Sequence, residues 1–292
     1  MLKRRNFIIS SIGVSAALIS TSRRFPTSRA HAQEVIEGDD PYADQVEPGL
    51  AYFRLLADRQ LPLVEDLAAN IRAKDLAGAL SAYVESRPPY EQIEVLAGDF
   101  EDTDTDIDAR PASFDFGDTD DAFKGFHRIE MLLYGDEDLD AALPYADELI
   151  ESVKQLRADL DVREKFSSAG QFAGMTGLAN EIAAKKVSSE EETWSDQSLL
   201  IFRHNFRGIH MQYNAYDQIV RGIDESAADA VKEAFIRADR SIQPYFRPFN
   251  TGSTVGYSQV KNAERREITK ASNQLRDALL GAAELLGLTE KL

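Results

Sequence analysis

The sequence predicts an all-α protein built from two helical-bundle halves of roughly four helices each. Apolar residues recur three and four positions apart through most of the chain, and no run shows the sustained alternation of a strand. Glycine and proline are sparse, at 17 and 10 of 292 residues, which favours helices. Apolar residues make up 43% of the chain, which is enough to bury a sizeable core.

The N-terminal half is predicted to span residues 46–165. Its first helix should bend at Pro62, because proline removes a helical hydrogen bond. The second should start at Asp75 and end at Pro88 and Pro89. The remaining predictions are a helix over 90–100, an acidic loop over 101–121, a helix over 122–135 capped by Asp120 or Asp121, and a helix over 139–160.

The C-terminal half is predicted to span residues 166–292, with the same helical period. One helix is predicted over 173–187, and a longer one should run over 195–223 without a break. A third should cover 224–246 after a cap at Asp224. Residues 250–288 are predicted to form a loop followed by a long terminal helix.

The first 32 residues have the layout of an export signal, not of a folded element. Basic residues precede the apolar stretch "FIISSIGVSAALI", which is too short to span a bilayer comfortably, and "AHA" at 30–32 is a small-residue cleavage site. Arg4 and Arg5 resemble a twin-arginine signal, with an ordinary secretory signal as the alternative. Residues 33–45 are predicted to be a flexible lead-in to an exported protein that is soluble and not embedded in a membrane.

The chain is strongly acidic, with a formal net charge of −17. Residues 1–32 hold six basic and no acidic residues, so the rest has 27 basic against 50 acidic residues, or −23. Such a surface repels nucleic acid and attracts cations, although solubility alone explains most of these charges. The sequence contains no cysteine, which excludes disulfides, thiolate metal sites, a cysteine nucleophile and a cysteine-linked lipid anchor.

The segment "GFHRIE", residues 125–130, is the main candidate for chemistry. His127 and Glu130 are three positions apart, so on a helix both side chains face the same way and can bind one ion. Gly125 permits close approach of a backbone or a ligand. A solvated pair beside a solvated loop is the simpler alternative. The acidic loop supplies further oxygen donors, namely Asp102, Asp104, Asp106, Asp108, Asp115, Asp118, Asp120 and Asp121.

Standard metal motifs do not account for these residues. In either register, "DTDTDID" lacks the glycine and the final glutamate of an EF-hand loop. No H-E-x-x-H zinc-peptidase motif occurs, and the inverted motif would need histidine where Met131 stands. Of the other histidines, His31 lies in the signal, and His204 and His210 are predicted to pack or to face solvent, because a spacing of six does not share a helix face well.

Several blocks together resemble the imelysin-like family, in particular its EfeO-type iron-uptake branch. "FKGFHRIEMLLYG" is similar to the family's G-x-H-x-x-E segment. Residues 88–110, "PPYEQIEVLAGDFEDTDTDIDAR", resemble its Y-E-x-I-E helix and the D-x-x-I-D-x-R loop that follows. Residues 178–208 are similar to a later block, except that "WSDQ" replaces a stretch that contains a histidine in the family. "VGYSQVKNAERREITKASNQLRDAL" resembles the terminal helix, so the resemblance covers about 46–290.

The resemblance implies two helical bundles with a metal-binding cleft beside the H-x-x-E helix. It carries over the ligands His127, Glu130 and Asp108 with one of Glu91 or Glu94, while Arg110 is expected to orient a carboxylate. The implied ion is iron, with zinc, manganese or copper as alternatives, because one imidazole with several carboxylates does not select among them.

The resemblance also implies a periplasmic protein that captures iron and passes it to a membrane iron permease, beside a peroxidase-like partner. The chain resembles the short form of the family, which has no N-terminal cupredoxin domain. We expect no enzymatic activity. Two alternatives stay open: a metallopeptidase of imelysin type, with Glu91 or Glu94 as its general base, and a metal-dependent module that binds an exported polysaccharide.

Overall fold

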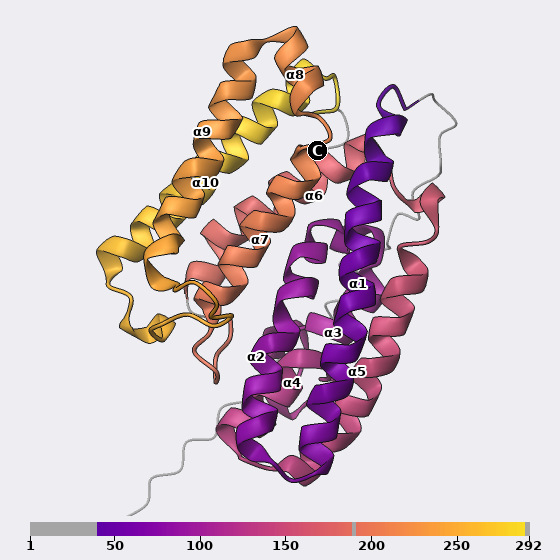
Figure 1. Ribbon diagram of the computed structural model, residues 1–292, viewed down its shortest axis with the longest axis vertical. Coiled ribbons are helices and arrows are strands. Elements are labelled where there is room, and N and C mark those ends of the chain that lie inside the picture. The colour runs from indigo at the N-terminus through magenta and orange to yellow at the C-terminus, as the bar shows by residue number, and fades with distance from the viewer. Residues whose placement is uncertain (1–39, 189–190, 290–292) are drawn as a thin grey trace, which may run out of the picture. The chain divides into compact units, whose positions relative to one another are not determined.

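The computed structural model describes residues 40–188 and 191–289, and the regular elements within them are helices, with no strand (Figure 1). The all-α class is therefore confirmed. The predicted export signal lies outside the described residues, as does the lead-in up to residue 39. No helix in this described part of the chain is both long enough and apolar enough to cross a membrane.

The α-helices of the described residues are α1 (Ala43–Arg72), α2 (Leu76–Ile93), α3 (Glu101–Asp108), α4 (Gly125–Glu130), α5 (Leu139–Asp159), α6 (Ser168–Ala184), α7 (Ser198–Tyr213), α8 (Asp217–Ile223), α9 (Glu225–Ile242) and α10 (Asn262–Leu285). A π-helical turn, η4 (Met131–Gly135), continues α4. Short 3-10 turns lie between the other helices, namely η1 (Glu94–Asp99), η2 (Pro111–Ser113), η3 (Gly117–Thr119), η5 (Arg163–Lys165), η6 (Lys186–Ser188), η7 (Gln243–Tyr245) and η8 (Tyr257–Gln259).

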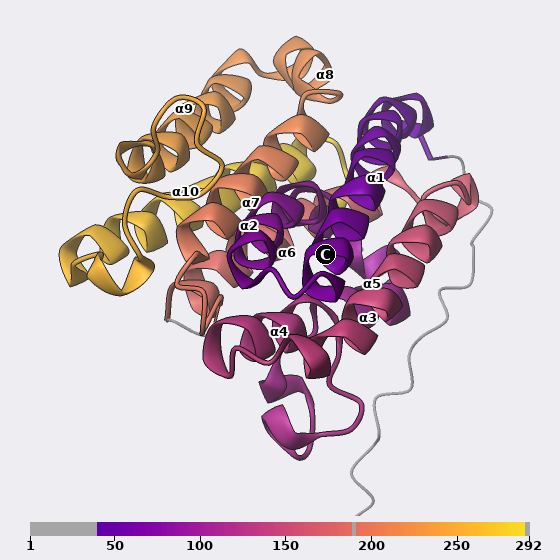
Figure 2. The same ribbon diagram turned by 60° about the horizontal axis from the view of Figure 1, so that its bottom comes forward.

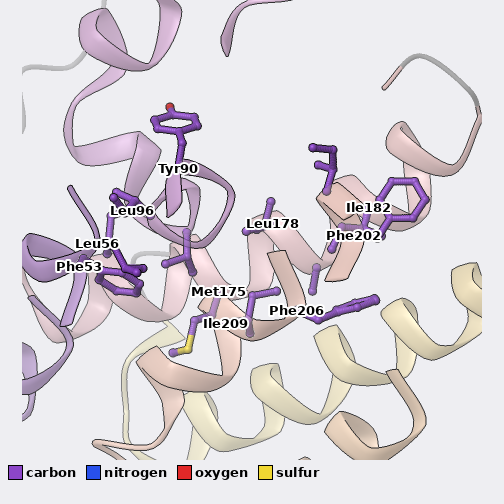
Figure 3. Close-up of a cluster of buried hydrophobic side chains, with 14 of the residues drawn as sticks. Phe53, Leu56, Tyr90, Leu96, Met175, Leu178, Ile182, Phe202, Phe206 and Ile209 are labelled. Carbon is purple, nitrogen blue, oxygen red and sulfur yellow. The ribbon is translucent and has the colours of Figure 1, made fainter. Parts of the chain in front are cut away.

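The helices form two groups that share one core. In the first, α1 packs along α2 and α5, and α3 and α4 pack against each other and against α5 (Figure 2). In the second, α10 packs along α6 and α9. Contacts of α2 with α7 and of η1 with α6 join the groups, and the buried apolar side chains form one cluster. Figure 3 shows Phe53 and Leu96 from the first group near Met175 of α6 and Ile209 of α7.

The helix α2 does not end at Pro88 and Pro89, as predicted, but runs through them to Ile93. Each proline removes a backbone hydrogen bond, at a cost of about 3 kcal/mol in a helix interior. Packing overrides this cost, because α2 is held between α1 and α7 and its last turns are mostly buried. The predicted helix over 90–100 is consequently wrong: its first part completes α2 and its second part is η1.

The acidic stretch after Phe100 is not a loop throughout, since its first eight residues form α3. Three acidic side chains lie in the first turn, where the helix dipole favours negative charge. Thr103 faces inward, and its hydroxyl donates a hydrogen bond of 2.6 Å to Asp159 of α5. Asp108 is therefore the last residue of a helix, buried and held in place, and not a side chain on a solvated loop.

The helix α4 begins at Gly125, not after a cap at Asp120 or Asp121. Asp120 instead accepts a hydrogen bond of 3.0 Å from the N–H of Ala122 in the preceding turn. Gly125 has a φ of +78°, and a Cβ there would lie 2.4 Å from the carbonyl oxygen of Ile107. Because only glycine tolerates both conditions, this residue sets the close approach of α4 to the end of α3.

Several further boundaries differ from the prediction, and α6 begins at Ser168, five residues before the predicted start at 173. The helix α1 begins at Ala43, inside the predicted lead-in. The helix predicted over 195–223 breaks at 214–216 into α7 and α8, where the buried Tyr216 donates its hydroxyl hydrogen to Gln171. The predicted starts at Asp75 and Asp224 are confirmed, because each carboxylate accepts a backbone N–H from the first turn of its helix. The predicted boundary near residue 165 stays a prediction.

Candidate metal centre

His127 and Glu130 lie in the interior of the protein, not on a solvated helix face. They are 1% and 0% exposed. Nδ1 of His127 lies 3.1 Å from Oε2 of Glu130, as their spacing on α4 requires. Nε2 of His127 faces Oδ1 of Asp108 at 3.5 Å, across the α3–α4 contact that Gly125 permits. Nε2 has no hydrogen-bond partner among the described residues, which is unusual for a buried polar atom.

Two buried glutamates that the sequence analysis did not single out complete this centre. One ligand atom each from Asp108, His127 and Glu191 lie within 4.8 Å of one another, and the same holds for His127, Glu130 and Glu192. Glu191 and Glu192 come from the loop after η6. The signals for them were the acidic run beside the single tryptophan, "EEETW", which is typical of a solvated loop, and its place within residues 178–208, which resemble a block of the family.

The same loop holds Glu130 in position through its backbone. The N–H groups of Trp194 and Ser195 each donate a hydrogen bond of 2.8 Å to Oε1 of Glu130. Glu192 and Asp196 have positive φ angles of 24° and 61°, so the loop folds tightly here. The segment "WSDQ", residues 194–197, thus provides two peptide donors to Glu130.

Arg87 is the central cation of the site, and it is fully buried. Its guanidinium nitrogens lie 2.7 Å from Asp108, 2.8 Å from Glu91 and 2.9 Å from Glu192. Only the contact with Asp108 has hydrogen-bond geometry, and the other two are close ionic contacts. The guanidinium carbon also lies 4.5 Å from the ring centroid of Phe126. Glu91 lies one turn away on the same helix, but Asp108 and Glu192 come from other segments, so no local sequence pattern indicated their contacts with this arginine.

Lys186, also fully buried, is the second cation. Its Nζ donates to both carboxylate oxygens of Glu94, at 2.8 and 2.9 Å, and lies 3.4 Å from Glu191. Asn205 of α7 donates to Glu94 at 2.7 Å and to Glu91 at 3.1 Å. The two predicted ligands Glu91 and Glu94 therefore lie in the same buried network, where they pair with Arg87 and Lys186. Neither belongs to the two sets of three potential metal ligands around His127.

Arg110 lies at the edge of the centre, with a side chain that is 17% exposed. Its guanidinium contacts Glu191 at 3.2 Å and Glu181 at 3.0 Å. It therefore contacts one of the two unforeseen glutamates directly.

Comparison with known proteins assigns the chain to a family. A model of the imelysin family (Peptidase_M75) matches residues 57–280, which is more than half of the sequence. The chain belongs to the imelysin family. Two EfeM/EfeO family lipoproteins of Staphylococcus aureus, from strains MRSA252 and MSSA476, are each 28% identical to it over 216 residues, covering 74% of this chain and 75% of theirs. The predicted identity as an imelysin-like protein of EfeO type is therefore confirmed.

A solved structure shares the fold of this imelysin-family chain. It is that of a putative iron-regulated protein A precursor from Parabacteroides distasonis ATCC 8503, with a TM-score of 0.58 over 85% of this chain and 97% of that one. At 15% identity the likeness shows the fold alone. The Staphylococcus relatives are named as lipoproteins, and the sequence here contains no cysteine.

The centre of this imelysin-family chain has an excess of negative charge. Six carboxylates are buried in it against three cations, Arg87, Lys186 and Arg110. Burial and, to a smaller extent, the charge of Glu130 raise the pKa of Glu192 to about 7. Burial also raises the pKa of Glu94 to about 7, although Lys186 opposes the shift. The site therefore holds protons on its carboxylates that a bound cation would displace.

The pKa shifts of Asp108 and His127 favour the charged form of each side chain. Burial alone would raise the pKa of Asp108, but Arg87 and His127 hold it well below its usual range. Burial alone would lower the pKa of His127, but Asp108 and the hydrogen bond to Glu130 raise it. Asp108 is thus ionised and favours a cation beside it, and a metal ion at His127 would compete with a proton for the imidazole.

Proposed function

We propose that this chain is an exported metal-binding protein of an EfeO-type iron-uptake system, which captures iron in the periplasm and delivers it to a membrane permease. The observation that carries the proposal is the buried centre around His127, where an unpartnered imidazole nitrogen faces Asp108 and Glu191 within an excess of carboxylates. One imidazole with several carboxylates suits iron, and also zinc, manganese and copper, so the choice of iron rests on the family.

The hydrogen bonds favour one position for the ion. Both oxygens of Glu130 already accept, one from two peptide N–H groups and one facing Nδ1 of His127. A proton on Nδ1 would donate to Glu130 and leave the Nε2 lone pair for the metal, as in carboxylate–histidine–metal arrangements. We therefore place the ion at Nε2, with Asp108 and Glu191 as co-ligands and Glu130 orienting the ring. Glu91 and Glu94 then balance the charges of Arg87 and Lys186.

The test is metal uptake by the purified chain, measured by equilibrium dialysis against iron, zinc and manganese in turn. The double variant His127→Ala with Glu130→Ala should lose binding while its helical circular-dichroism spectrum is kept. The matched control is Glu148→Ala with Glu151→Ala, an exposed acidic pair of the same spacing on α5. Unchanged stoichiometry in the first variant would rule out the site.

Single variants distinguish between the two possible positions of the ion, one beside Asp108 and Glu191 and the other beside Glu130 and Glu192. Asp108→Asn or Glu191→Gln should abolish binding if the ion lies at Nε2, whereas Glu130→Gln should weaken it by about 10-fold to 100-fold, as is typical for a residue that orients a ligand. If the ion instead lies between His127, Glu130 and Glu192, Glu130→Gln should abolish metal binding and Glu191→Gln should only weaken it.

A metallopeptidase is the second candidate, favoured by the family description and by a set of one histidine and two carboxylates that a zinc hydrolase can use. A peptide substrate would have to reach residues that are at most 5% exposed, such as Asp108 and His127. Zinc-loaded protein incubated with a peptide library decides between the two. Metal uptake without hydrolysis would eliminate the peptidase, and hydrolysis lost in His127→Ala would favour it.

Delivery to a permease is tested in cells. Iron accumulation by the producing organism should fall when this chain is deleted and should return with the wild-type chain, but not with His127→Ala. Genes for a membrane permease and a haem peroxidase beside this one would independently support the uptake system. Full accumulation in the deletion strain under iron limitation would argue against the delivery step.

A further inference from the structure

A second site candidate lies on the C-terminal helices, away from the metal centre. A groove with a cavity volume of about 850 Å³ is lined by residues of α7, α8 and α9 and the start of η7. These helices contact one another in the second group of the fold (Figure 1). The volume is within the range of small-molecule pockets, which is roughly 300–1,000 Å³.

The charge of this groove is opposite to that of the whole chain. Five cationic side chains line it against three aspartates, which leaves a surplus of two positive charges, while the chain carries −17. Arg221 pairs with two of those aspartates, Asp217 and Asp229. The other four cations make no ion pair with any described residue, and they are Arg203, Arg207, Lys232 and Arg240.

The floor of the groove is aromatic and contains an unpaired polar atom. Phe206, Tyr213 and Phe235 line it and are 6%, 2% and 8% exposed. The Tyr213 hydroxyl has no hydrogen-bond partner among the described residues, although buried hydroxyls are normally paired. The Arg203 guanidinium lies 4.3 Å from the ring centroid of Phe246, which limits its freedom before a ligand arrives.

We infer that this groove binds a small organic polyanion, whose carboxylates pair with the unpaired cations and whose apolar body lies on Phe206, Tyr213 and Phe235. Arginine side chains can bind a carboxylate through two parallel hydrogen bonds, and Arg203 and Arg207 are one turn apart on α7. The Tyr213 hydroxyl would donate a hydrogen bond to the same ligand. A single unpaired surface cation is ordinary, but here four of them line the same groove as a buried, unsatisfied hydroxyl.

The site is independent of the proposed metal centre, although α7 contributes to both. Asn205 contacts Glu91 and Glu94, whereas Arg203 and Arg207 on either side of it line the groove. His127→Ala should therefore abolish metal uptake and leave anion binding unchanged. This comparison distinguishes a failure of the groove assignment from a failure of the metal proposal.

The test is calorimetric titration of the chelator-washed full chain with three probes: citrate, trimesate and naphthalene dicarboxylate. We expect at least one to bind, more weakly as salt is raised, and the neutral trimethanol analogue of trimesate not to bind. Arg203→Gln with Arg207→Gln should lower the affinity by about tenfold or more. The control, Arg237→Gln with Arg266→Gln, removes two exposed cations outside the groove and should leave the affinity unchanged.

Tyr213→Phe distinguishes a specific binding site from nonspecific electrostatic attraction of anions. It removes a hydroxyl without a described partner, so the unfolding midpoint should not fall, while the affinity should drop by about threefold to tenfold. Retained affinity in this variant, an equal loss in the control variant, or no binding of any of the three anions would overturn the inference.

Discussion

At the scale of single residues, Lys186 shows how the metal centre tolerates its buried charge. The ammonium group is fully buried between Glu94 and Glu191. Burial would lower its pKa, but the charges of Glu191 and Glu94 raise it well above the usual range, so the lysine stays protonated. Such a buried ion pair stabilises the fold only while the lysine and its carboxylates are all present, because removing one charge leaves the other buried and unpaired.

The first prediction follows from that pairing. Lys186→Met should lower the free energy of unfolding of the metal-free protein by about 3–5 kcal/mol, because it leaves the buried Glu94 without its cation and Glu191 with Arg110 alone. Urea unfolding measures the change, with the exposed neighbour Lys185→Met as the control. Adding Glu94→Gln to Lys186→Met should recover part of the loss. Equal stability of the two single lysine variants would contradict the buried pair.

At the scale of elements, two close helix contacts bring the ligands together. Gly125 lets the start of α4 lie against the end of α3, so that His127 meets Asp108. Gly208 lets α7 approach α2, because a Cβ there would lie 2.3 Å from the carbonyl oxygen of Gln92. Asn205, one turn earlier on α7, then reaches the carboxylates at the end of α2.

The second prediction concerns Gly125→Ala. The new Cβ would meet the Ile107 carbonyl at 2.4 Å and would also strain a φ of +78°. We expect a loss of about 2–4 kcal/mol in unfolding free energy and weaker metal binding, because α4 must move away from α3. Thermal unfolding and dialysis measure the two effects.

Gly177→Ala is the matched control for Gly125→Ala. Gly177 lies exposed in α6 with open space around it, and alanine there should stabilise the protein by about 0.5–1 kcal/mol. A Gly125→Ala protein that binds metal as tightly as the wild type would show that the α3–α4 contact does not control the site.

At the scale of the whole molecule, the buried carboxylates couple stability to pH in two separate windows. Glu94 and Glu192 have folded-state pKa values of about 7, above their unfolded value, so their contribution is present below about pH 4.5 and is lost as the pH rises to about 7. Asp108 has a depressed pKa, so its contribution is present above its ordinary pKa and is lost in strong acid.

The third prediction is therefore that the metal-free protein loses stability between about pH 4.5 and 7. Glu94→Gln with Glu192→Gln should flatten this fall, because an amide cannot release the proton. Unfolding midpoints across this range, measured with a chelator present, test it. A wild-type stability that rises through the same window would show that these two carboxylates ionise freely in the folded protein.

The fourth prediction is that metal affinity rises with pH up to at least about 7, because the ion competes with protons on the centre. Each proton released changes the affinity by about tenfold per pH unit. Calorimetry in buffers of different ionisation enthalpy counts the protons. Binding without proton release at pH 6 would contradict the proposed coupling.

Much of the fold could be predicted from local patterns. The helical period, the caps at Asp75 and Asp224 and the pairing of His127 with Glu130 depend on residues within one or two turns of each other. The predictions that were wrong have a common cause. The helix α2 passes through Pro88 and Pro89 because α1 and α7 enclose it, and α3 forms where composition alone indicated a loop.

The sequence by itself determined the all-α class, the acidity and one histidine–glutamate pair, because these depend on composition and on spacing along a single helix. The remainder of the metal centre depends on how distant segments pack together. Arg87, Lys186 and Glu191 lie far from His127 in the sequence, and packing removes them from water together. Burial turns such charges from solvated surface groups into an interdependent network, and no local pattern specifies which distant residues will be buried together.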